Sequence, residues 1–289
     1  MPELPEVETV RLGLQRQTQD FLIERVEVLR DRAIAAPDPA LFCVALQDCR
    51  IASWRRRGKY LLADLRDLDD EPAGIWGVHL RMTGQFLWLP ATGSAASGSG
   101  SDPGIHTRVR VWGSGGAELR FIDIRSFAQM WFVPHGRPVE TVITGLAKLG
   151  PEPFDQEFSV RYLKDRLRGS QRPIKSSLLD QSLVAGVGNI YADESLFAAG
   201  IRPQTPSGRL TLANLERLRH CLVEVLKVSI GAGGTSFSDF RDLTGTNGNY
   251  GGQAWVYRRA GLACRQCGAT LVRERLAGRS THWCPQCQS

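Results

Sequence analysis

Four cysteines near the C-terminus constrain the fold of this 289-residue chain more than any other feature. They follow the pattern Cys264-x2-Cys267-x16-Cys284-x2-Cys287, which is the spacing of a two-pair zinc site. Each C-x-x-C pair offers two thiolates on one tight turn, and the residues between the pairs would form a hairpin around a tetrahedral ion. We therefore expect one structural Zn²⁺, on which so small a module depends to fold. A pair of disulfides is the alternative, which a reducing compartment disfavours.

The same stretch is strongly basic. The chain has a net charge of +6, of which residues 257–289 carry +5 and the remainder +1. A basic module on a nearly neutral body indicates a polyanionic partner, whereas the alternative is a solvated basic tail. With 42% hydrophobic residues, no apolar run near the roughly 18 residues of a membrane span and no leader pattern, we expect a cytoplasmic protein without membrane contact. No association surface is visible, which favours a monomer.

The chain opens with the sequence MPELPEVE. If Met1 is removed, Pro2 becomes a free secondary amine beside two carboxylates. An α-amino group has a pKa near 8, against about 10.4 for lysine, so roughly a tenth of it is neutral at pH 7. Such an amine can attack a sugar carbon and pass through an iminium intermediate. The alternative is an ordinary helix start, because proline and acidic residues favour the first turn of a helix.

The pattern of apolar residues divides the chain into parts. Residues 2–17 read as a helix, and a mostly β domain follows to residue 135, with an insertion at 91–104 that reads as a disordered loop. Residues 136–150 read as a linker and 151–256 as a helical domain, in which Asn189 is an expected N-cap, Thr211 opens a longer helix and 233–252 is a long loop. The zinc finger occupies 257–289. Strands are expected at 21–30, 50–66, 75–89, 106–113, 118–124 and 129–133.

Five motifs in this order resemble the formamidopyrimidine-DNA glycosylase and endonuclease VIII family of DNA repair enzymes. From the N-terminus to the C-terminus they are PELPEVE, RRGKYL at 56–61, HLRMTG at 79–84, LLDQ leading into GVGNIY at 178–191, and the zinc hairpin with its GRST segment at 278–281. The resemblance implies an α+β multidomain fold: an N-terminal β-sandwich with flanking helices, a helix-two-turn-helix domain and a C-terminal zinc-finger hairpin. The leucine and second proline of PELPEVE resemble the N-terminal motif in the branch of the family that acts on oxidised purines.

The resemblance also implies a reaction. The enzyme would be a bifunctional DNA glycosylase and abasic-site lyase that removes oxidised purines, 8-oxoguanine and formamidopyrimidines, from double-stranded DNA. Pro2 would attack C1′ and displace the base, with Glu3 as acid or base at the sugar and Glu6 in support. Lys59 would assist β-elimination and Arg279 δ-elimination, and no cofactor would take part in the chemistry.

Because a base must leave the duplex to be reached, something must fill the gap it leaves. The resemblance assigns this role to Met82, Arg125 and Phe127, although Met82 and Phe127 also read as ordinary core residues. It assigns phosphate contacts to Lys175 and Asn189, with His79 and His106 as further DNA-binding candidates.

The match departs from the family pattern in two places. The family usually has Asp-x-Arg-Arg-Phe-Gly at the gap-filling turn, where this chain has Asp-Ile-Arg-Ser-Phe-Ala at 123–128. The segment 244–252 lacks the usual Asp-Gly…Gly-Tyr-Phe pattern. Two alternatives therefore stay open: an enzyme of the same family that prefers oxidised pyrimidines or abasic sites, and a zinc-dependent DNA-binding protein without catalysis.

Overall fold

The computed structural model describes residues 1–91, 104–235, 243 and 248–289. Most of the predicted loops at 91–104 and 233–252 therefore lies outside the described residues. The described chain forms two compact units. The first contains Met1–Pro2, Glu6–Ala147 and Thr235–Gly248, and the second contains Glu3–Pro5, Lys148–Gly234 and Asn249–Ser289.

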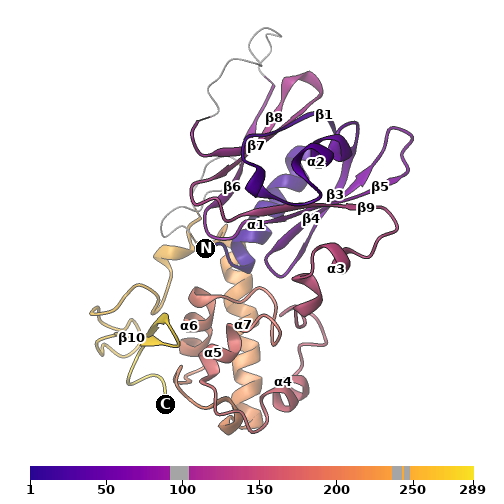
Figure 1. The fold of residues 1–289 in the computed structure, drawn as a ribbon. Helices are drawn as coiled ribbons and strands as arrows, with labels where there is room; N and C mark the ends of the chain where they lie inside the picture. The colour runs from indigo at the N-terminus through magenta and orange to yellow at the C-terminus, as the bar shows by residue number, and fades with distance from the viewer. Residues whose placement is uncertain (92–103, 236–242, 244–247) are drawn as a thin grey trace. The chain divides into compact units, whose positions relative to one another are not determined.

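The first unit is built on nine strands in the order β2-β9-β5-β4-β3-β1-β7-β8-β6 (Figure 1). Strand β1 pairs with β3 through its first two residues and with β7 through the rest, after a bulge. One strand thus belongs to both halves of the sheet. The strands are β1 Phe21–Val28, β2 Ile34–Ala36, β3 Arg50–Arg57, β4 Tyr60–Arg66, β5 Pro72–His79, β6 Gly84–Leu89, β7 Thr107–Gly113, β8 Glu118–Asp123 and β9 Gln129–Pro134.

Aromatic side chains pack the two halves of this sheet against each other. The ring of Phe86 on β6 lies 6.2 Å from that of Trp54 on β3 and 5.9 Å from that of Trp76 on β5. These three side chains are almost fully buried, and burial of rings this large supplies much of the stability of a core. The α-helices of this unit are α1 Leu4–Thr18, from Glu6 onward, α2 Pro39–Leu46 and the short α3 Val139–Val142.

Helix α1 is fixed to the sheet by polar as well as apolar contacts. Its residues Val7, Val10 and Leu14 are buried in the core of the first unit. The indole of Trp54 donates to Thr18 Oγ1 at 2.9 Å, and the backbone N–H of the same residue donates to Gln15 Oε1 at 2.7 Å. This anchoring fixes the helix that follows the N-terminal dipeptide.

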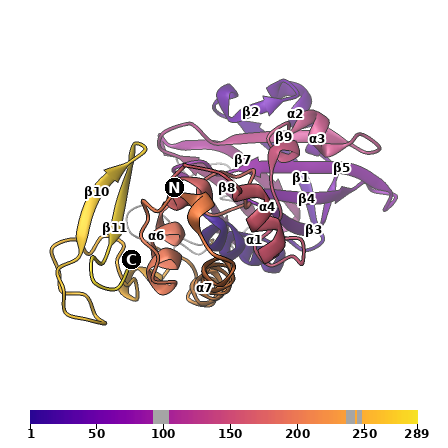
Figure 2. The ribbon, with the colours of Figure 1, turned by 90° about the horizontal axis from the view of Figure 1, so that it is seen from below.

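The second unit is helical, with a small hairpin at its end (Figure 2). Helix α6 packs against α7 and against strand β11, and its core includes Tyr191, Leu196 and Leu222. The elements are α4 Val160–Leu167, α5 Ile174–Leu178, α6 Asn189–Ala198, α7 Leu212–Gly231, β10 Val272–Leu276 and β11 Arg279–Trp283, with one-turn 3-10 helices at Ser207–Arg209 and Tyr250–Gly252. The predicted fold class is confirmed: a β-sandwich with helices, a helical domain and a C-terminal hairpin.

The structure corrects several sequence-based element boundaries. The predicted strands 50–66 and 75–89 are each two strands, because the turns at 58–59 and 80–83 reverse the chain. Helix α2 was not expected. Helix α7 starts at Thr211 as predicted, and the structure shows that Thr211 is its N-cap, in a capping box with Asn214. The prediction of Asn189 as an N-cap is wrong, since Gly188 is the N-cap of α6. No helix in the described ranges is long and apolar enough to cross a membrane.

Candidate functional site

The N-terminal residues of the first unit lie beside an open hollow. Met1 is 52% exposed, whereas Pro2 is buried. Met1, Met82 and Phe127 all line the same hollow of about 420 Å³. The residue that precedes Pro2 thus lies at the same hollow as two of the residues predicted to fill a gap in DNA.

Glu3, which belongs to the second unit, caps the N-terminus of helix α6. Its carboxylate accepts the backbone N–H of Ile190 at 3.0 Å and that of Tyr191 at 3.4 Å. A carboxylate is stabilised at a helix N-terminus because the N–H groups there have no partner within the helix and the helix dipole is positive. Glu3 thus performs the capping that the sequence suggested for Asn189, from a position far away in the chain.

Lys59 lies in the tight turn between β3 and β4. Gly58 takes the left-handed φ of +56° that this turn requires, and the pair Arg57 and Tyr60 closes the hairpin. The side chain of Lys59 is largely buried, with 7% of the residue exposed. The turn thus holds its ammonium in one restricted place rather than on a free surface.

His79 is the register partner of Tyr60 on strand β5, and their rings lie edge to face with centroids 4.5 Å apart. Its Nδ1 accepts the backbone N–H of Arg81 at 3.0 Å, so the neutral ring carries its proton on Nε2. Burial, with the positive charges of Arg81 and Lys59, lowers the pKa of His79 to about 3. His79 is therefore a neutral hydrogen-bond donor at physiological pH. His106 is half-buried in the turn before β7.

The predicted gap-filling residues lie together on the first unit. A guanidinium nitrogen of Arg125 is 2.9 Å from the sulfur of Met82, and its carbon lies 4.9 Å from the ring centroid of Phe127. Met82 and Phe127 are 40% and 41% exposed, which is high for such large apolar side chains. Buried Asp123 shapes the turn by accepting the backbone N–H groups of Arg125 and Ala128.

Lys175 and Asn189, which are predicted to contact phosphate, hold strand β11 within the second unit. The ammonium of Lys175, 1% exposed, lies 2.7 Å from Asp193 Oδ1 and donates to Ser280 O at 2.7 Å and Thr281 Oγ1 at 2.8 Å. Asn189 Nδ2 donates to the same carbonyl of Ser280 at 2.9 Å. Burial lowers the pKa of Lys175 and the charge of Asp193 opposes that effect. Their phosphate contacts stay a prediction.

Arg279 begins strand β11, directly after the tight turn at Gly278, whose φ is +79°. Its side chain is exposed. The bonds to Ser280 and Thr281 described above fix the strand immediately next to it. Arg279 therefore has a well-fixed backbone and a side chain open to solvent.

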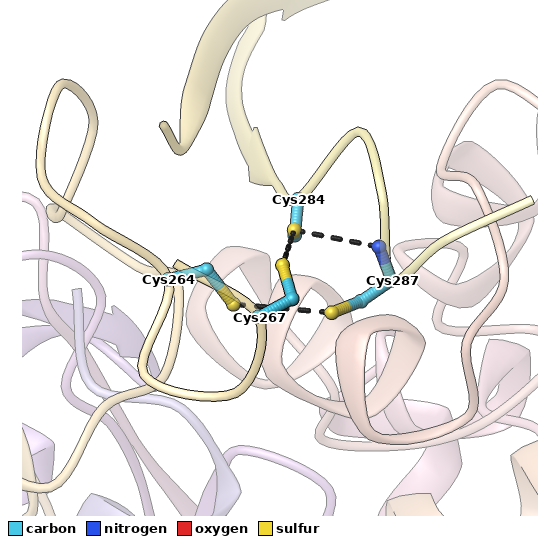
Figure 3. A group of neighbouring side chains, drawn as sticks. All are labelled: Cys264, Cys267, Cys284 and Cys287. Carbon is cyan, nitrogen blue, oxygen red and sulfur yellow. Dashed lines mark hydrogen bonds between the residues drawn. The ribbon is translucent and has the colours of Figure 1, made fainter. Parts of the chain in front are cut away.

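The four cysteines converge on one point (Figure 3). Their sulfur atoms lie within 4.8 Å of one another, with 3.9 Å between Cys264 and Cys287 and 3.5 Å between Cys267 and Cys284. Tetrahedral bonds of about 2.3 Å require sulfur atoms about 3.8 Å apart, so the set fits Zn²⁺. The prediction of one structural zinc ion is confirmed by this cluster and by the family match below. The ion would join the two cysteine pairs at the base of the hairpin.

Two neighbouring acidic residues of helix α6 were missed from the sequence. Asp193, 0% exposed, also accepts the backbone N–H of His282 at 2.9 Å. Glu194, equally buried, accepts the backbone N–H groups of Trp255, Val256 and Tyr257 at 2.8–2.9 Å. The available signal was the pair of acids inside a mostly apolar helix, because buried charges need partners.

Comparison with known proteins agrees with this arrangement. Three family models match the chain: the formamidopyrimidine-DNA glycosylase N-terminal domain at residues 1–130, the H2TH domain of the same enzymes at 149–241, and the zinc finger found in FPG and IleRS at 261–289. A formamidopyrimidine-DNA glycosylase from Synechococcus sp. is 66% identical over 289 residues, which cover 100% of this chain and 99% of that protein.

Solved structures are also similar over the full length. A variant of Lactococcus lactis FPG in complex with Fapy-dG-containing DNA has a TM-score of 0.88 at 30% identity, with 100% of both chains covered. The wild-type L. lactis protein in complex with DNA containing an oxidised pyrimidine has a TM-score of 0.87 at 30% identity and the same coverage.

These matches, together with the cysteine cluster and the fold, define a DNA-repair protein of the glycosylase and lyase class. The chain belongs to the formamidopyrimidine-DNA glycosylase family. Members of this family are bifunctional DNA glycosylases and abasic-site lyases, and the chain is an enzyme of base-excision DNA repair.

Proposed function

We propose that this enzyme removes oxidised purines, 8-oxoguanine and formamidopyrimidines, from double-stranded DNA and then cleaves the strand by β,δ-elimination. The proposal is supported by the 66% identical relative, which is named for formamidopyrimidines, and by the similar structure in complex with Fapy-dG-containing DNA. DNA is the polyanion that the basic C-terminal module suggests. Its location would be the cytoplasm, with the nucleoid.

In the first step the neutral amine of Pro2, freed by loss of Met1, attacks C1′ of the damaged nucleotide. The bond between C1′ and the base breaks, the base leaves as an anion with the bonding electrons, and the carboxylate of Glu3 takes up the proton that the nitrogen of Pro2 loses. Glu3 protonates the ring oxygen O4′, so that the sugar opens and the nitrogen lone pair forms an iminium with C1′. Glu6, which accepts the backbone N–H of Thr235 at 2.8 Å, supports the site.

The strand is then cut twice. The iminium acidifies C2′, loss of that proton expels the 3′ phosphate, and Lys59 assists this β-elimination. A second proton loss expels the 5′ phosphate in the δ-elimination. The guanidinium of Arg279 binds the departing phosphate through two parallel hydrogen bonds. The products are a one-nucleotide gap with phosphates at both ends and an unsaturated sugar, which hydrolysis releases from Pro2.

The flipped nucleotide leaves a gap that Met82, Arg125 and Phe127 would fill, since apolar wedges stabilise unstacked DNA. His79 would donate from Nε2 to a phosphate, and His106, Lys175 and Asn189 are further candidates for phosphate contacts. The observation that carries the proposal is the shared hollow of Met1, Met82 and Phe127. It supports the proposal because Met1, the residue that precedes Pro2, lines the same hollow as two of the proposed gap-filling residues.

Borohydride trapping tests the proposal on the processed protein. A duplex with 8-oxoguanine opposite cytosine is expected to give a covalent adduct that Pro2→Gly abolishes, because borohydride reduces an iminium to a stable amine. Edman sequencing provides the control that Met1 is absent. An adduct on an abasic duplex but none on the 8-oxoguanine duplex would retain the lyase and overturn the purine preference.

A second candidate is an enzyme that prefers oxidised pyrimidines. The similar L. lactis structure in complex with an oxidised pyrimidine favours it. Rates of excision on 8-oxoguanine and 5-hydroxycytosine duplexes, measured side by side, decide between the two. A zinc-dependent DNA-binding protein without catalysis would bind the duplex and give no adduct at all.

A further inference from the structure

Arg32 places a second guanidinium beside Phe127, the aromatic residue of the predicted gap-filling group, which we call the wedge. It lies in the one-turn 3-10 helix Asp31–Ala33, and its side chain is exposed. Its guanidinium carbon lies 5.7 Å from the ring centroid of Phe127, to which Arg125 also lies close, at 4.9 Å. One exposed aromatic ring is thus in contact range of two arginines that are distant in the chain.

Two arginine side chains line the same hollow. Arg32 and Arg81 both line it, together with Met82 and Phe127. The guanidinium of Arg81 is held by Gln129 Oε1 at 2.8 Å. None of the residues lining the hollow carries an acidic side chain, so the two cations are not neutralised by a carboxylate on its wall.

The sequence of the gap-filling turn at 123–128 lacks one of the two arginines that are usual in the family. The family pattern has two consecutive arginines before the phenylalanine, whereas this chain has Arg125 followed by Ser126. Ser126 also lines the hollow, with a left-handed φ of +53°. Arg32 therefore lies on the hollow next to the position where the pattern has lost a cation.

We propose that Arg32, supported by Arg81, binds a backbone phosphate of DNA beside the Phe127 wedge, in place of the arginine missing at position 126. The inference rests on the proposed function, because it takes Phe127 as the residue that enters the duplex. Guanidinium groups bind phosphate oxygens through two parallel hydrogen bonds, and stacking on an aromatic ring orients the group beforehand. Such a contact positions Phe127 on the DNA and does not contribute to recognition of the base sequence.

Equilibrium binding to a duplex with a tetrahydrofuran abasic-site analogue tests this assignment. We expect Arg32→Ala to weaken binding about tenfold, as the loss of a charged hydrogen bond does, and to reduce the slope of log K against log salt by about 1 between 50 and 200 mM KCl. The loss should be equal opposite cytosine and opposite adenine. Arg30→Ala, an exposed arginine two residues away that does not line the hollow, is the matched control and should keep the wild-type slope.

Rescue variants separate a phosphate contact from a structural role. Arg32→Lys should keep the slope, and Ser126→Arg in the Arg32→Ala protein should restore it, while the melting temperature stays at the wild-type value throughout. A slope in Arg32→Ala equal to that of Arg30→Ala would overturn the proposal. A changed cytosine-to-adenine preference at unchanged slope would also overturn it, because it assigns Arg32 to a base edge.

The proposed function fails separately. If the wild-type protein gives no borohydride adduct on either duplex, the glycosylase and lyase proposal falls, whatever the slope. If the wild-type protein gives the adduct but Arg32→Ala leaves the salt slope of DNA binding unchanged, only the phosphate assignment falls.

Discussion

A β-carbon added at Gly188 would overlap with Cδ of Glu3. No side chain fits there while Glu3 keeps its place, so only glycine lets this carboxylate reach the N-terminus of helix α6. The carboxylate proposed to move a proton at the sugar is therefore positioned by the absence of a side chain 185 residues away.

Gly188→Ala is accordingly expected to displace Glu3 and to reduce base excision by at least about 100-fold, the contribution typical of one acid–base group. The helical unit should still fold, because the φ of Gly188 is −134° and suits alanine. Excision of 8-oxoguanine under single-turnover conditions measures the effect. Gly231→Ala, at a glycine in α7 with open space around it, is the control, and an equal loss in both variants would contradict the assignment.

Lys175→Met should destabilise the protein by about 3–5 kcal/mol, because it leaves the buried carboxylate of Asp193 without its ammonium. The midpoint of urea unfolding measures the loss. Replacing both residues, in Lys175→Met with Asp193→Leu, should recover part of the stability, since an apolar pair removes the unpaired charge. A salt slope of DNA binding that falls by about 1 with little loss of stability would instead support the predicted phosphate contact.

The lowered pKa of His79 predicts a specific dependence of stability on pH. The unfolded histidine binds a proton below its usual pKa near 6.5, whereas the folded one binds it only near 3. The unfolded state therefore holds more protons between about pH 3 and 6.5, and stability should rise with pH across that window and level off above it. Melting temperatures from pH 4 to 8 should show a smaller rise in His79→Asn than in the wild type, while His220→Asn, at an exposed site on α7, keeps the full rise.

Loss of zinc should unfold the hairpin and remove Arg279 from its fixed place. Metal analysis is expected to give one zinc per chain, which Cys267→Ser reduces and Cys43→Ser, outside the cluster, leaves unchanged. DNA affinity and δ-elimination should both fall in Cys267→Ser, because the cluster closes the base of the hairpin that carries Arg279. Full zinc occupancy in Cys267→Ser would contradict the four-cysteine assignment.

Much of the fold could be predicted from the sequence because its signals are local. The spacing of Cys264, Cys267, Cys284 and Cys287 specified a metal-closed hairpin, since four thiolates on two tight turns have few other stable arrangements. Thr211 specified the start of α7 because a hydroxyl caps the helix that directly follows it. The N-terminal PELPEVE and the other short motifs were sufficient to indicate the family.

The remaining features depend on contacts between distant parts of the chain. Asn189 looked like a cap, but Glu3 occupies the helix end that it would have capped. Lys175 was predicted to contact phosphate, and only the structure shows that Asp193 and strand β11 enclose its ammonium. The juxtaposition of Arg32 with Phe127 has no local signal at all. The sequence by itself determined most of the elements, the metal ligands and the chemical groups, because those follow from neighbours in the chain. Only the tertiary structure decided which charges are buried, paired or left at the surface, because burial and pairing are set by residues that folding brings together.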